Sequence, residues 1–356
     1  GPDDAAIIGI LNDRFGLINT SHTVDIEVQN VGNNPISSIT IDLFDGTSNP
    51  QVYSVSLNPG EIETVTHGHL ISTAVVEEIA FTTTISQVNS TTDSDTTNNG
   101  GFGFYSALPF APTKNPVIEE GTGTPCGWCP RGTVAMDYMY DNYPDFHGIA
   151  VHCYFGMDPM SIEDYELESD FFGYPSMHVD RDQKNLDIAT SFLETTYLSR
   201  KQLLTPVNLS GSASGSGSNI TVNVEALFHT DISNEDYRLG VILMEDSLWG
   251  TTSEWEQANN YAGGGNGVMG GFELLPGMVP ANQISYDHVP RVLLGGYDGQ
   301  PGSVPGPIVQ NYTASYAFNY TIPGGYYRDK MYGIVLLIDN KTGVIMNGQN
   351  FAIEDV

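Results

Sequence analysis

The chain has 356 residues, which is long enough for two or three domains with buried cores of their own. It carries 43 acidic residues against 12 basic ones, and its formal net charge is -31. This balance argues against nucleic acid as a partner, because binding to phosphate requires Lys and Arg, and it disfavours anionic membrane surfaces for the same reason. No apolar run reaches about 18 residues, so we expect no transmembrane segment.

Composition also bears on the cellular compartment. Asp3 and Asp4, with no positive region or apolar stretch behind them, do not resemble the start of a signal peptide. The chain is rich in Asn, Thr and Ser and poor in Lys, which favours an exported protein in an oxidising compartment. Three cysteines are too few for a disulfide scaffold, and they leave Cys153 as an odd thiol beside Cys126 and Cys129.

Residues 3–100 predict a β-sandwich. Residues 22–30 and 36–44 alternate apolar and polar side chains, as half-buried strands do, and residues 75–85 are another strand-rich stretch. Gly, Pro, Asn and Asp separate these runs as turn signals. Short strands at close spacing with such turns are typical of a sandwich.

The same segment resembles a known domain. Residues 26–32, 57–61 and 95–99 are similar in pattern to the cell-adhesion-related bacterial Ig-like domain. The resemblance implies an Ig-like sandwich without catalytic chemistry. Asp93 and Asp95 offer oxygen ligands for calcium, and the alternative is a solvated hairpin loop.

Residues 101–113 are rich in Gly and Pro and predict a linker. The periodicity then changes over residues 114–205 to alternating strands and helices, an α/β order. We expect strands at 116–120, 147–155 and 173–181 and helices at 130–143, 161–172 and 186–204. Ser161 and Asp164 resemble a capping box, and the apolar run at 147–155 predicts a central strand covered on both faces.

Residues 206–356 return to β structure. Strands are expected at 219–228, 237–245, 312–322, 331–338 and 344–346. Residues 247–309 form a long Gly/Pro-rich loop, and a loop of that length is usually functional or mobile. Within it, Trp249 and Trp255 provide either an aromatic binding platform or loop packing, while His288 and Arg291 are expected to tie the loop to its domain.

The strongest chemical signal is the Cys126-x-x-Cys129 pair, which follows a predicted strand and precedes a predicted helix. Exposed amides at a helix N-terminus favour a thiolate, so Cys126 is expected to attack and Cys129 to resolve. Arg131 would add positive potential. A stable disulfide and a metal half-site with His152 and Cys153 are the alternatives, although adjacent residues on one strand point to opposite faces.

Other side chains near the pair have candidate roles. Glu120, at the inner end of the preceding strand, is placed to accept the proton of Cys129. Trp128, between the two thiols, offers an aromatic face to a docking chain, with plain packing as the alternative. A copper site would recruit the thioether and imidazole groups of Met157, Met160, Met177 and His178. Core packing explains these residues more simply, so we expect no metal and no cofactor.

The middle segment resembles the thioredoxin superfamily. Residues 126–130 fit its active-site motif, Glu120 falls where that family keeps its buried acid, and residues 174–176 look like its cis-proline turn. The resemblance implies that Tyr174 and Pro175 contact the substrate chain. Pro125 departs from the pattern, because thioredoxins usually have Trp there.

A narrower resemblance covers residues 114–356. It is to the thioredoxin-like, outer-membrane-protein-28-related family of proteins exported by Gram-negative bacteria. The similar stretches are residues 119–132, 150–153, 173–176, 180–181, 238–246 and 288–291. This resemblance implies a location in the periplasm, at the cell surface or outside the cell.

Together these observations predict a multidomain α+β chain. Its parts are an Ig-like β-sandwich at 3–100, a thioredoxin-like α/β domain at 114–205 and a C-terminal β-sandwich at 206–356. The predicted function is an exported thiol–disulfide oxidoreductase acting on protein thiols and disulfides. The alternative is a cell-surface adhesion protein that binds a cell-surface or carbohydrate ligand and uses the Cys126–Cys129 disulfide structurally.

Overall fold

The computed structural model describes residues 1–354, which divide into two compact units. The first unit comprises residues 1–111 together with the short segments 229–233 and 307–311. The second unit holds the remaining described residues and includes both cysteines of the Cys-x-x-Cys pair. Across residues 1–354, no helix is long and apolar enough to cross a membrane.

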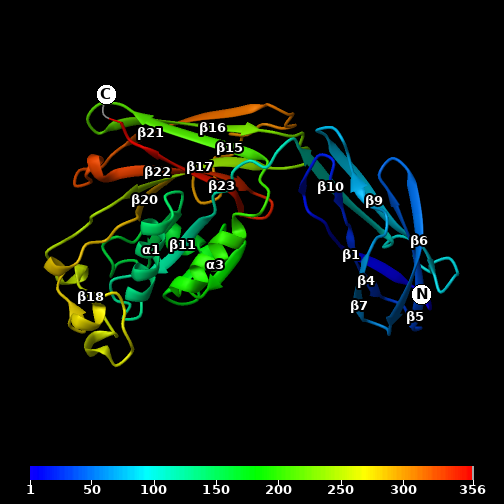
Figure 1. Cartoon of the computed structure of the whole chain (residues 1–356), viewed down its shortest axis with the longest axis horizontal. Helices are drawn as coiled ribbons and strands as arrows, with labels where there is room; N and C mark the ends of the chain where they lie inside the picture. The colour runs from blue at the N-terminus through cyan, green and yellow to red at the C-terminus, as the bar shows by residue number, and fades with distance from the viewer. Residues whose placement is uncertain (355–356) are drawn as a thin grey trace. The chain divides into compact units, whose positions relative to one another are not determined.

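The first unit is built from strands (Figure 1). A three-stranded sheet has the order β1-β4-β7, a five-stranded sheet has the order β2-β10-β9-β5-β6, and β3 pairs with β8. The bounds are β1 Ala5–Leu11, β2 Phe15–Leu17, β3 Ser21–His22, β4 Asp25–Asn30, β5 Ile36–Phe44, β6 Ser48–Leu57, β7 Ile62–Thr66, β8 Ile71–Ser72, β9 Glu78–Val88 and β10 Gly100–Leu108. Residues 100–108, which overlap the expected linker, therefore form a strand.

The alternation of apolar and polar side chains along the strands determines which residues form the core of this unit. Ile26 and Val28 on β4 are buried while their neighbours are partly exposed, and Ile39, Ile41 and Leu43 on β5 repeat the pattern. These side chains meet in one apolar cluster that draws on both larger sheets. The period-2 pattern visible in the sequence is thus the pattern that the fold buries.

The second unit contains three sheets of more than two strands. Parallel pairing joins β11 to β12, antiparallel pairing joins β11 to β13 and β13 to β14, and the resulting order is β12-β11-β13-β14. Two antiparallel sheets have the orders β15-β16-β21 and β20-β17-β22-β23. The bounds are β11 Val117–Thr122, β12 His147–His152, β13 Ser176–Val179, β14 Gln183–Leu186, β15 Val207–Ser214, β16 Asn219–Phe228, β17 Tyr237–Glu245, β20 Val289–Leu294, β21 Thr313–Thr321, β22 Met331–Asp339 and β23 Val344–Ala352.

The α-helices of the described residues are α1 (Pro130–Asn142), α2 (Glu163–Glu168) and α3 (Thr190–Arg200). The helix expected at 161–172 is shorter than predicted, and it begins after Ile162 with no side-chain cap, so the predicted capping box does not form. The helix expected at 186–204 is also shorter, because residues 183–186 pair with β13 as strand β14.

The sheet β12-β11-β13-β14 is covered on its two faces by different layers (Figure 1). On one face Ile118 and Met177 pack with Met136 and Met139 of α1 and with Leu193 of α3. The other face packs on a sheet of the C-terminal segment, through residues that form a second apolar cluster. That cluster includes Val117, Ile149, Val151, Ile242, Ile334, Leu336 and Ile345.

This arrangement corrects the predicted fold class. The expected multidomain α+β chain with a separate thioredoxin-like α/β domain is wrong, because the described residues form 23 strands and three α-helices of 13, 6 and 11 residues. Residues 114–205 also share one compact unit and one core with the C-terminal strands. Strands therefore supply the second covering layer that helices supply in an α/β fold.

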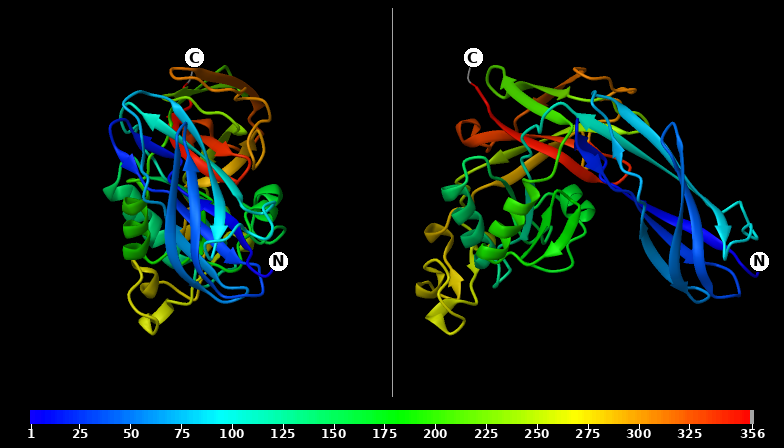
Figure 2. Two further views of the ribbon diagram at one scale, coloured as in Figure 1. Left: turned by 90° about the vertical axis from the view of Figure 1, so that its right-hand side faces the viewer. Right: turned by 45° about the vertical axis from the view of Figure 1, so that its right-hand side comes forward.

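The long loop contains short elements of its own. They are η1 (Ser253–Trp255), β18 (Gln257–Ala258), η2 (Ala262–Gly264), η3 (Phe272–Leu274), β19 (Met278–Val279) and η4 (Ala281–Gln283), and η5 (Arg328–Lys330) lies further along the chain. β18 and β19 pair with each other. Both views of Figure 2 show the yellow loop beside α1, where Gly270 lies against Val134.

Candidate functional site

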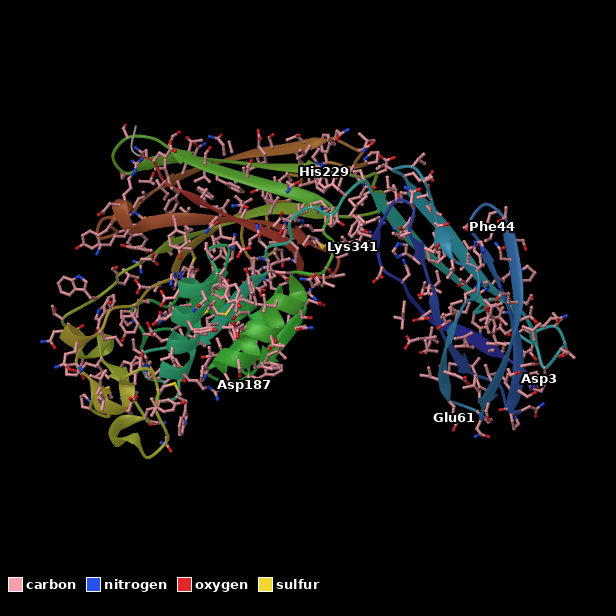
Figure 3. The ribbon with its side chains drawn as sticks, in the orientation of Figure 1. Asp3, Phe44, Glu61, Asp187, His229 and Lys341 are labelled. Carbon is pink, nitrogen blue, oxygen red and sulfur yellow. A yellow bond between two sulfur atoms is a disulfide. The ribbon has the colours of Figure 1, made fainter. Side chains whose placement is uncertain are left out.

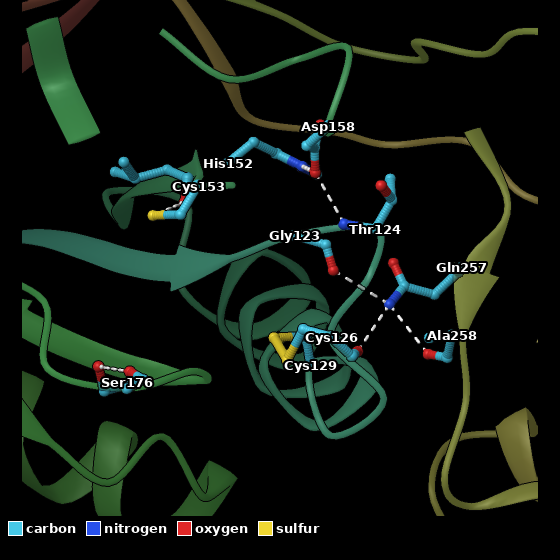
Figure 4. Close-up of a disulfide and its surroundings, with 12 residues drawn as sticks. Gly123, Thr124, Cys126, Cys129, His152, Cys153, Asp158, Ser176, Gln257 and Ala258 are labelled. Carbon is cyan, nitrogen blue, oxygen red and sulfur yellow. Dashed lines mark hydrogen bonds and ion pairs between the residues drawn. A yellow bond between two sulfur atoms is a disulfide. The ribbon is translucent and has the colours of Figure 1, made fainter. Parts of the chain in front are cut away.

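The candidate site lies in the loop that connects strand β11 to helix α1. β11 ends at Thr122, α1 begins at Pro130, and the loop between them carries Cys126 and Cys129 joined in a disulfide (Figure 4). Pro130 occupies the first helical turn, where its missing N–H costs nothing. Cys126 is 5% exposed and Cys129 is 1% exposed, so the pair is more enclosed than the sequence predicts for an attacking thiol.

The loop holds the pair against the first turn of α1 through backbone bonds. The N–H of Cys129 donates to the carbonyl of Cys126 at 3.2 Å, and the N–H groups of Gly132 and Thr133 donate to the carbonyl of Cys129. Arg131 pairs with Asp187, which Figure 3 labels, at 2.6 Å. The positive charge expected to act on the thiols is therefore shared with a carboxylate.

Glu120 lies on β11 with its side chain buried to 1% exposure. The pKa of Glu120 is raised to about 8, chiefly by burial; a hydrogen bond with Thr122 opposes the rise, and the nearby charge of Asp137 adds to it. Its Oε1 has no hydrogen-bond partner among the described residues. The carboxyl packs so closely on Gly132 of α1 that a Cβ there would overlap Oε1. Glycine at this position lets the acid reach the helix start.

The predicted cis-proline turn at Tyr174 and Pro175 lies close to the end of β11 that leads into this loop. Antiparallel pairing of β13 with β11 sets Ser176 opposite Gly121, and the Tyr174–Pro175 peptide bond just before β13 is cis. The ring of Tyr174 lies 5.1 Å from that of Tyr154. Neither the backbone N–H nor the C=O of Tyr174 is hydrogen-bonded within residues 1–354. The turn therefore presents an unused backbone donor and acceptor.

A segment of the long loop lies beside the backbone of the loop that carries the disulfide (Figure 4). The Nε2 of buried Gln257 donates to the carbonyl oxygens of Cys126 at 3.0 Å and Gly123 at 3.3 Å. The N–H of Ala258 donates to the carbonyl of Thr124 at 2.8 Å, and the N–H of Asn260 to the carbonyl of Gly127 at 2.8 Å. These bonds fix residues 257–260 along the Cys-x-x-Cys loop.

Trp128 is 47% exposed, and its ring meets that of Tyr261 edge-on with centroids 5.5 Å apart. One side of the ring thus packs on the long loop, and the rest is open to solvent. Trp255 packs near Tyr286 inside the loop, with ring centroids 6.3 Å apart, and Trp249 is 57% exposed.

The residues of the alternative metal sites have other contacts. His152 pairs with Asp158 at 2.8 Å, and Asp158 also accepts the N–H of Thr124. Burial raises the pKa of Cys153 to about 12, which leaves it an inert thiol. In the described part of the chain, no three His, Cys, Asp or Glu side chains are grouped to hold a metal ion.

The methionines proposed for copper are spread apart. Met160 packs with Leu248 and Tyr286, and Met177 packs with the α1 and α3 core. Met157 is 58% exposed, and His178 is buried with its ring 4.0 Å from that of Phe171. Core and surface positions therefore account for each of these residues separately.

Two loop residues behave as expected for structural ones. His288 stacks on Tyr140 with ring centroids 3.6 Å apart and bonds the hydroxyl of Tyr332 at 2.9 Å. Arg291 pairs with buried Glu245 at 3.1 Å.

Three residues of the site were not identified from the sequence. Gln257 bonds Cys126 from 131 residues away, Asp158 caps the Cys-x-x-Cys loop through Thr124, and Gly132 makes room for Glu120. A Gln in a loop, an Asp after a strand and a Gly in a helix are individually ordinary. Only Gly132 offered a hint, because glycine inside a helix costs about 1 kcal/mol relative to alanine and so has a reason to be there.

Gln257→Ala should make the disulfide easier to reduce. The substitution removes a buried side chain and its bonds to the Cys126 and Gly123 carbonyls, so the loop gains freedom and solvent gains access. We expect the rate of reduction by a water-soluble phosphine to rise several-fold, as measured by alkylation and mass spectrometry. The exposed Gln202→Ala is the matched control, and equal rates in the two variants would show that residues 257–260 do not shield the pair.

No protein-family model and no curated protein matches the chain. Among solved structures, the chain is similar to HBP35 of Porphyromonas gingivalis at 13% identity and a TM-score of 0.52, over 68% of this chain and 76% of that one. This likeness shows a shared fold.

Two further similar structures cover parts of the chain. A domain of the outer membrane lipoprotein Omp28 from P. gingivalis matches at 14% identity and a TM-score of 0.25, over 42% of this chain and 90% of that one. The CARDB domain of the PF1109 protein from Pyrococcus furiosus matches at 19% identity and a TM-score of 0.26, over 30% of this chain and 89% of that one.

Proposed function

We propose that the protein catalyses thiol–disulfide exchange with protein substrates through Cys126 and Cys129. The observation that carries the proposal is the setting of the disulfide. It lies at the N-terminus of α1. Glu120, a buried acid whose Oε1 has no hydrogen-bond partner among the described residues, lies on the preceding strand β11, and the turn with an unused backbone comes just before β13, which pairs with β11. Exposed amides at a helix N-terminus stabilise a thiolate, and an acid with a pKa near neutrality suits proton transfer.

In the reduced protein, the Cys126 thiolate attacks a substrate disulfide and forms a mixed disulfide while one substrate sulfur leaves as a thiolate. Cys129 then attacks the Cys126 sulfur, which releases the second substrate sulfur and closes the Cys126–Cys129 disulfide. The substrate disulfide gains the two electrons that the protein dithiol loses. The reverse sequence oxidises a substrate dithiol.

Glu120 serves this sequence as the proton acceptor for Cys129. Cys129 must lose its proton before it can attack the mixed disulfide, and both residues lie buried against the start of α1. A carboxyl with a pKa of about 8 accepts and returns a proton at neutral pH with little driving force in either direction. An ordinary, exposed glutamate would hold a proton too weakly for this purpose.

The substrate is a polypeptide in this proposal. The free N–H and C=O of Tyr174 can pair with an extended chain, as exposed strand edges do. Trp128, between the two cysteines in the sequence, is 47% exposed, which supports a docking role for it. Pro175 would then shape the groove between Tyr174 and the disulfide.

The test is reduction of insulin disulfides by the protein in the presence of a chemical reductant. We expect activity in the wild type, loss of activity in Cys126→Ser, and a trapped mixed disulfide in Cys129→Ser, because the resolving thiol is missing. Cys153→Ser is the control that should retain activity, since Cys153 is a buried thiol that takes no part in the disulfide. A wild type no faster than the reductant alone would contradict the proposal.

A second candidate function is binding at the cell surface, with the disulfide in a structural role. The observation that favours it is the cover of residues 257–260 and the 5% exposure of Cys126. The reduction potential separates the two candidates. Structural disulfides lie below about −300 mV, so a value there would support the binding protein and a higher value the oxidoreductase.

We also propose that the protein is exported. Disulfides persist in oxidising compartments, and a net charge of -31 suits a soluble exterior protein. The proposal therefore includes membership of the outer-membrane-protein-28-related exported proteins and a domain boundary within residues 100–114. Release of the mature protein to the cell surface, measured by surface proteolysis of intact cells, is the corresponding test.

A further inference from the structure

A pocket of about 340 Å³ lies in the second unit, at the end of β11 that is opposite to the disulfide. Asn115, which lines it, precedes β11, and His147, which also lines it, begins the parallel strand β12, whereas Cys126 follows the other end of β11. Five of the ten described residues that line the pocket carry a carboxamide, namely Asn115, Asn208, Asn347, Gln349 and Asn350. The pocket is therefore rich in paired hydrogen-bond donors and acceptors.

Hydrogen bonds connect these residues into one network. The Nδ2 of Asn115 donates to Oε1 of Gln349 at 3.2 Å, and the backbone N–H of Asn115 donates to Oδ1 of Asn347 at 2.8 Å. The Nε2 of Gln349 donates to the carbonyl of Asn350 at 3.2 Å. The backbone N–H of Asn350 donates to Nε2 of His147 at 3.0 Å. Residues from the start of β11, from β12 and from β23 thus lie next to one another around the pocket.

The network leaves two polar groups unused. Neither Oδ1 of Asn115 nor Nδ2 of Asn350 has a hydrogen-bond partner in residues 1–354. The buried side chain of Asn115 is nevertheless held in one orientation, because its Nδ2 also donates to the carbonyl of Gly348 at 3.0 Å. An acceptor that is fixed in advance costs a ligand little conformational entropy.

The pocket is electrically neutral, although the chain carries a net charge of -31. None of the described residues that line it is Lys, Arg or Glu. Its carboxylate, Asp145, pairs with Lys201 and accepts a hydrogen bond from the hydroxyl of Tyr197 at 3.0 Å. Burial lowers the pKa of His147, so its ring is uncharged at neutral pH. An anionic ligand would find no cation here, and a cationic ligand would have to displace Lys201 from Asp145.

These properties favour a neutral ligand with several hydroxyl groups. A carboxamide offers a donor and an acceptor side by side, which is the combination that two adjacent hydroxyls of a sugar ring can pair with. Leu209 and Pro144 also line the pocket and add apolar surface, which suits the C–H groups of such a ring. The volume of about 340 Å³ lies within the usual range of small-molecule sites, about 300–1,000 Å³.

We propose that this pocket binds a neutral sugar, with one hydroxyl donating to Oδ1 of Asn115 and another accepting from Nδ2 of Asn350. The shared chemistry is an uncharged pyranose ring, which a free monosaccharide or the terminal residue of a glycan supplies. The inference goes beyond the proposed exchange reaction and does not depend on it, because no residue of the Cys-x-x-Cys loop lines the pocket.

The experiment is saturation-transfer NMR of the full chain with the methyl glycosides of glucose, galactose, mannose and N-acetylglucosamine. We expect saturable binding of at least one glycoside, with a Kd of about 0.1–10 mM, as a few hydrogen bonds would give. A tetrahydropyran without ring hydroxyls should not bind, because it would leave the polar groups of the pocket unpaired. The absence of saturable binding of all four glycosides would overturn the proposal.

An oligosaccharide that ends in the bound sugar distinguishes the two sources. Tighter binding of the oligosaccharide than of the methyl glycoside would identify the end of a glycan as the ligand. Equal or weaker binding would identify the free sugar. Both results require that the pocket accepts a single neutral ring, so both support the proposal.

Variants locate the site. Asn350→Ala removes an exposed side chain, so the protein should fold normally, and binding of the glycoside should weaken about five- to tenfold, the usual worth of one hydrogen bond. Asn223→Ala is the matched control, because Asn223 is exposed on β16 and does not line the pocket. Equal affinity in the two variants would place the sugar elsewhere and overturn the proposal.

Discussion

Glu120→Gln is expected to stabilise the protein at alkaline pH while it slows thiol–disulfide exchange. In the folded protein the pKa of Glu120 is about 8, against an ordinary value of 4.5, because burial disfavours the carboxylate. The folded state therefore holds a proton that the unfolded state loses between those two values. The free energy of unfolding must fall as pH rises from about 4.5 to about 8, by about 1.4 kcal/mol per unit.

The sign follows from proton counting. Below pH 4.5 both states are protonated, and the contribution of Glu120 to stability is fully present; above pH 8 it is lost. Glutamine is neutral throughout, so the variant should not show this decline. We expect the variant to gain several kcal/mol relative to the wild type between the two ends of that range.

Urea unfolding followed by tryptophan fluorescence measures the pH dependence of the free energy of unfolding in the unit that contains Glu120. All three tryptophans, Trp128, Trp249 and Trp255, lie in the second compact unit with Glu120. Glu194→Gln on α3 is a control that should keep the wild-type pH dependence, because Glu194 is only partly buried and accepts hydrogen bonds from the hydroxyls of Tyr138 and Tyr143. A Gln variant whose stability falls with pH as steeply as the wild type would show that Glu120 is ionised when folded.

The activity should move in the opposite direction. Without a proton acceptor for Cys129, resolution of the mixed disulfide should slow by about 10²–10⁴-fold, the usual contribution of general acid–base catalysis. Single-turnover release of a labelled substrate thiol measures this step. A variant that is both more stable at high pH and slower identifies Glu120 as a residue kept for chemistry, whereas an unchanged rate would leave the acid with no part in exchange.

Much of the local structure was predictable, because it depends on neighbouring residues. Alternation at 22–30 and 36–44 indicated strands β4 and β5, and Pro130 marked the start of α1 where a proline is tolerated. The Cys126 and Cys129 pair between a strand and a helix was visible for the same reason. These signals are short-range, and tertiary contacts did not override them.

The layers that cover the two faces of the sheet containing β12 were not predictable from the sequence. The apolar run at 147–155 indicated burial on both faces, but it could not say what covers them. The run forms β12, which lies at the edge of its sheet and not at its centre, and the N–H of Ala150 bonds the carbonyl of His288. One face packs on C-terminal strands such as β22. An apolar strand has the same sequence whether a helix or a sheet buries it, so the fold class was wrong.

The local surroundings of the disulfide were visible in the sequence only in part. Glu120 and the turn at Tyr174 were identified through a resemblance, and the structure places both next to the loop that carries the disulfide. The cover by Gln257 was missed because it arrives from 131 residues away along the chain. Contacts of that range leave no periodic trace in a single sequence.

Adjacent glutamates on β11 show how much their surroundings decide. Successive side chains of a strand point to opposite faces, so Glu119 and Glu120 enter different layers. Glu119 is paired with Arg181, whose Nη2 donates to it at 2.8 Å and whose Nε donates at 3.0 Å. Tyr165 also donates its hydroxyl to Glu119, and the guanidinium of Arg181 lies 3.5 Å from the ring centroid of Tyr297.

Arg181→Met should therefore be among the most destabilising single substitutions in the second unit. The substitution leaves the Glu119 carboxylate buried without its cation, and breaking a buried pair in this way costs about 3–5 kcal/mol. Exposed Lys184→Met, which removes the 3.6 Å pair with Asp170, should cost less than about 1 kcal/mol. Urea unfolding by tryptophan fluorescence compares the two variants directly.

The double variant Glu119→Gln, Arg181→Met decides between charge and packing as the cause. If the uncompensated carboxylate dominates, its removal should restore most of the stability that Arg181→Met loses, because a neutral amide needs no cation. If the double variant is no more stable than Arg181→Met, the loss comes from the guanidinium packed on Tyr297. The first outcome would make Glu119 a structural charge whose pairing fixes β11, and it would leave its neighbour Glu120, with no such partner, as the acid available for proton transfer.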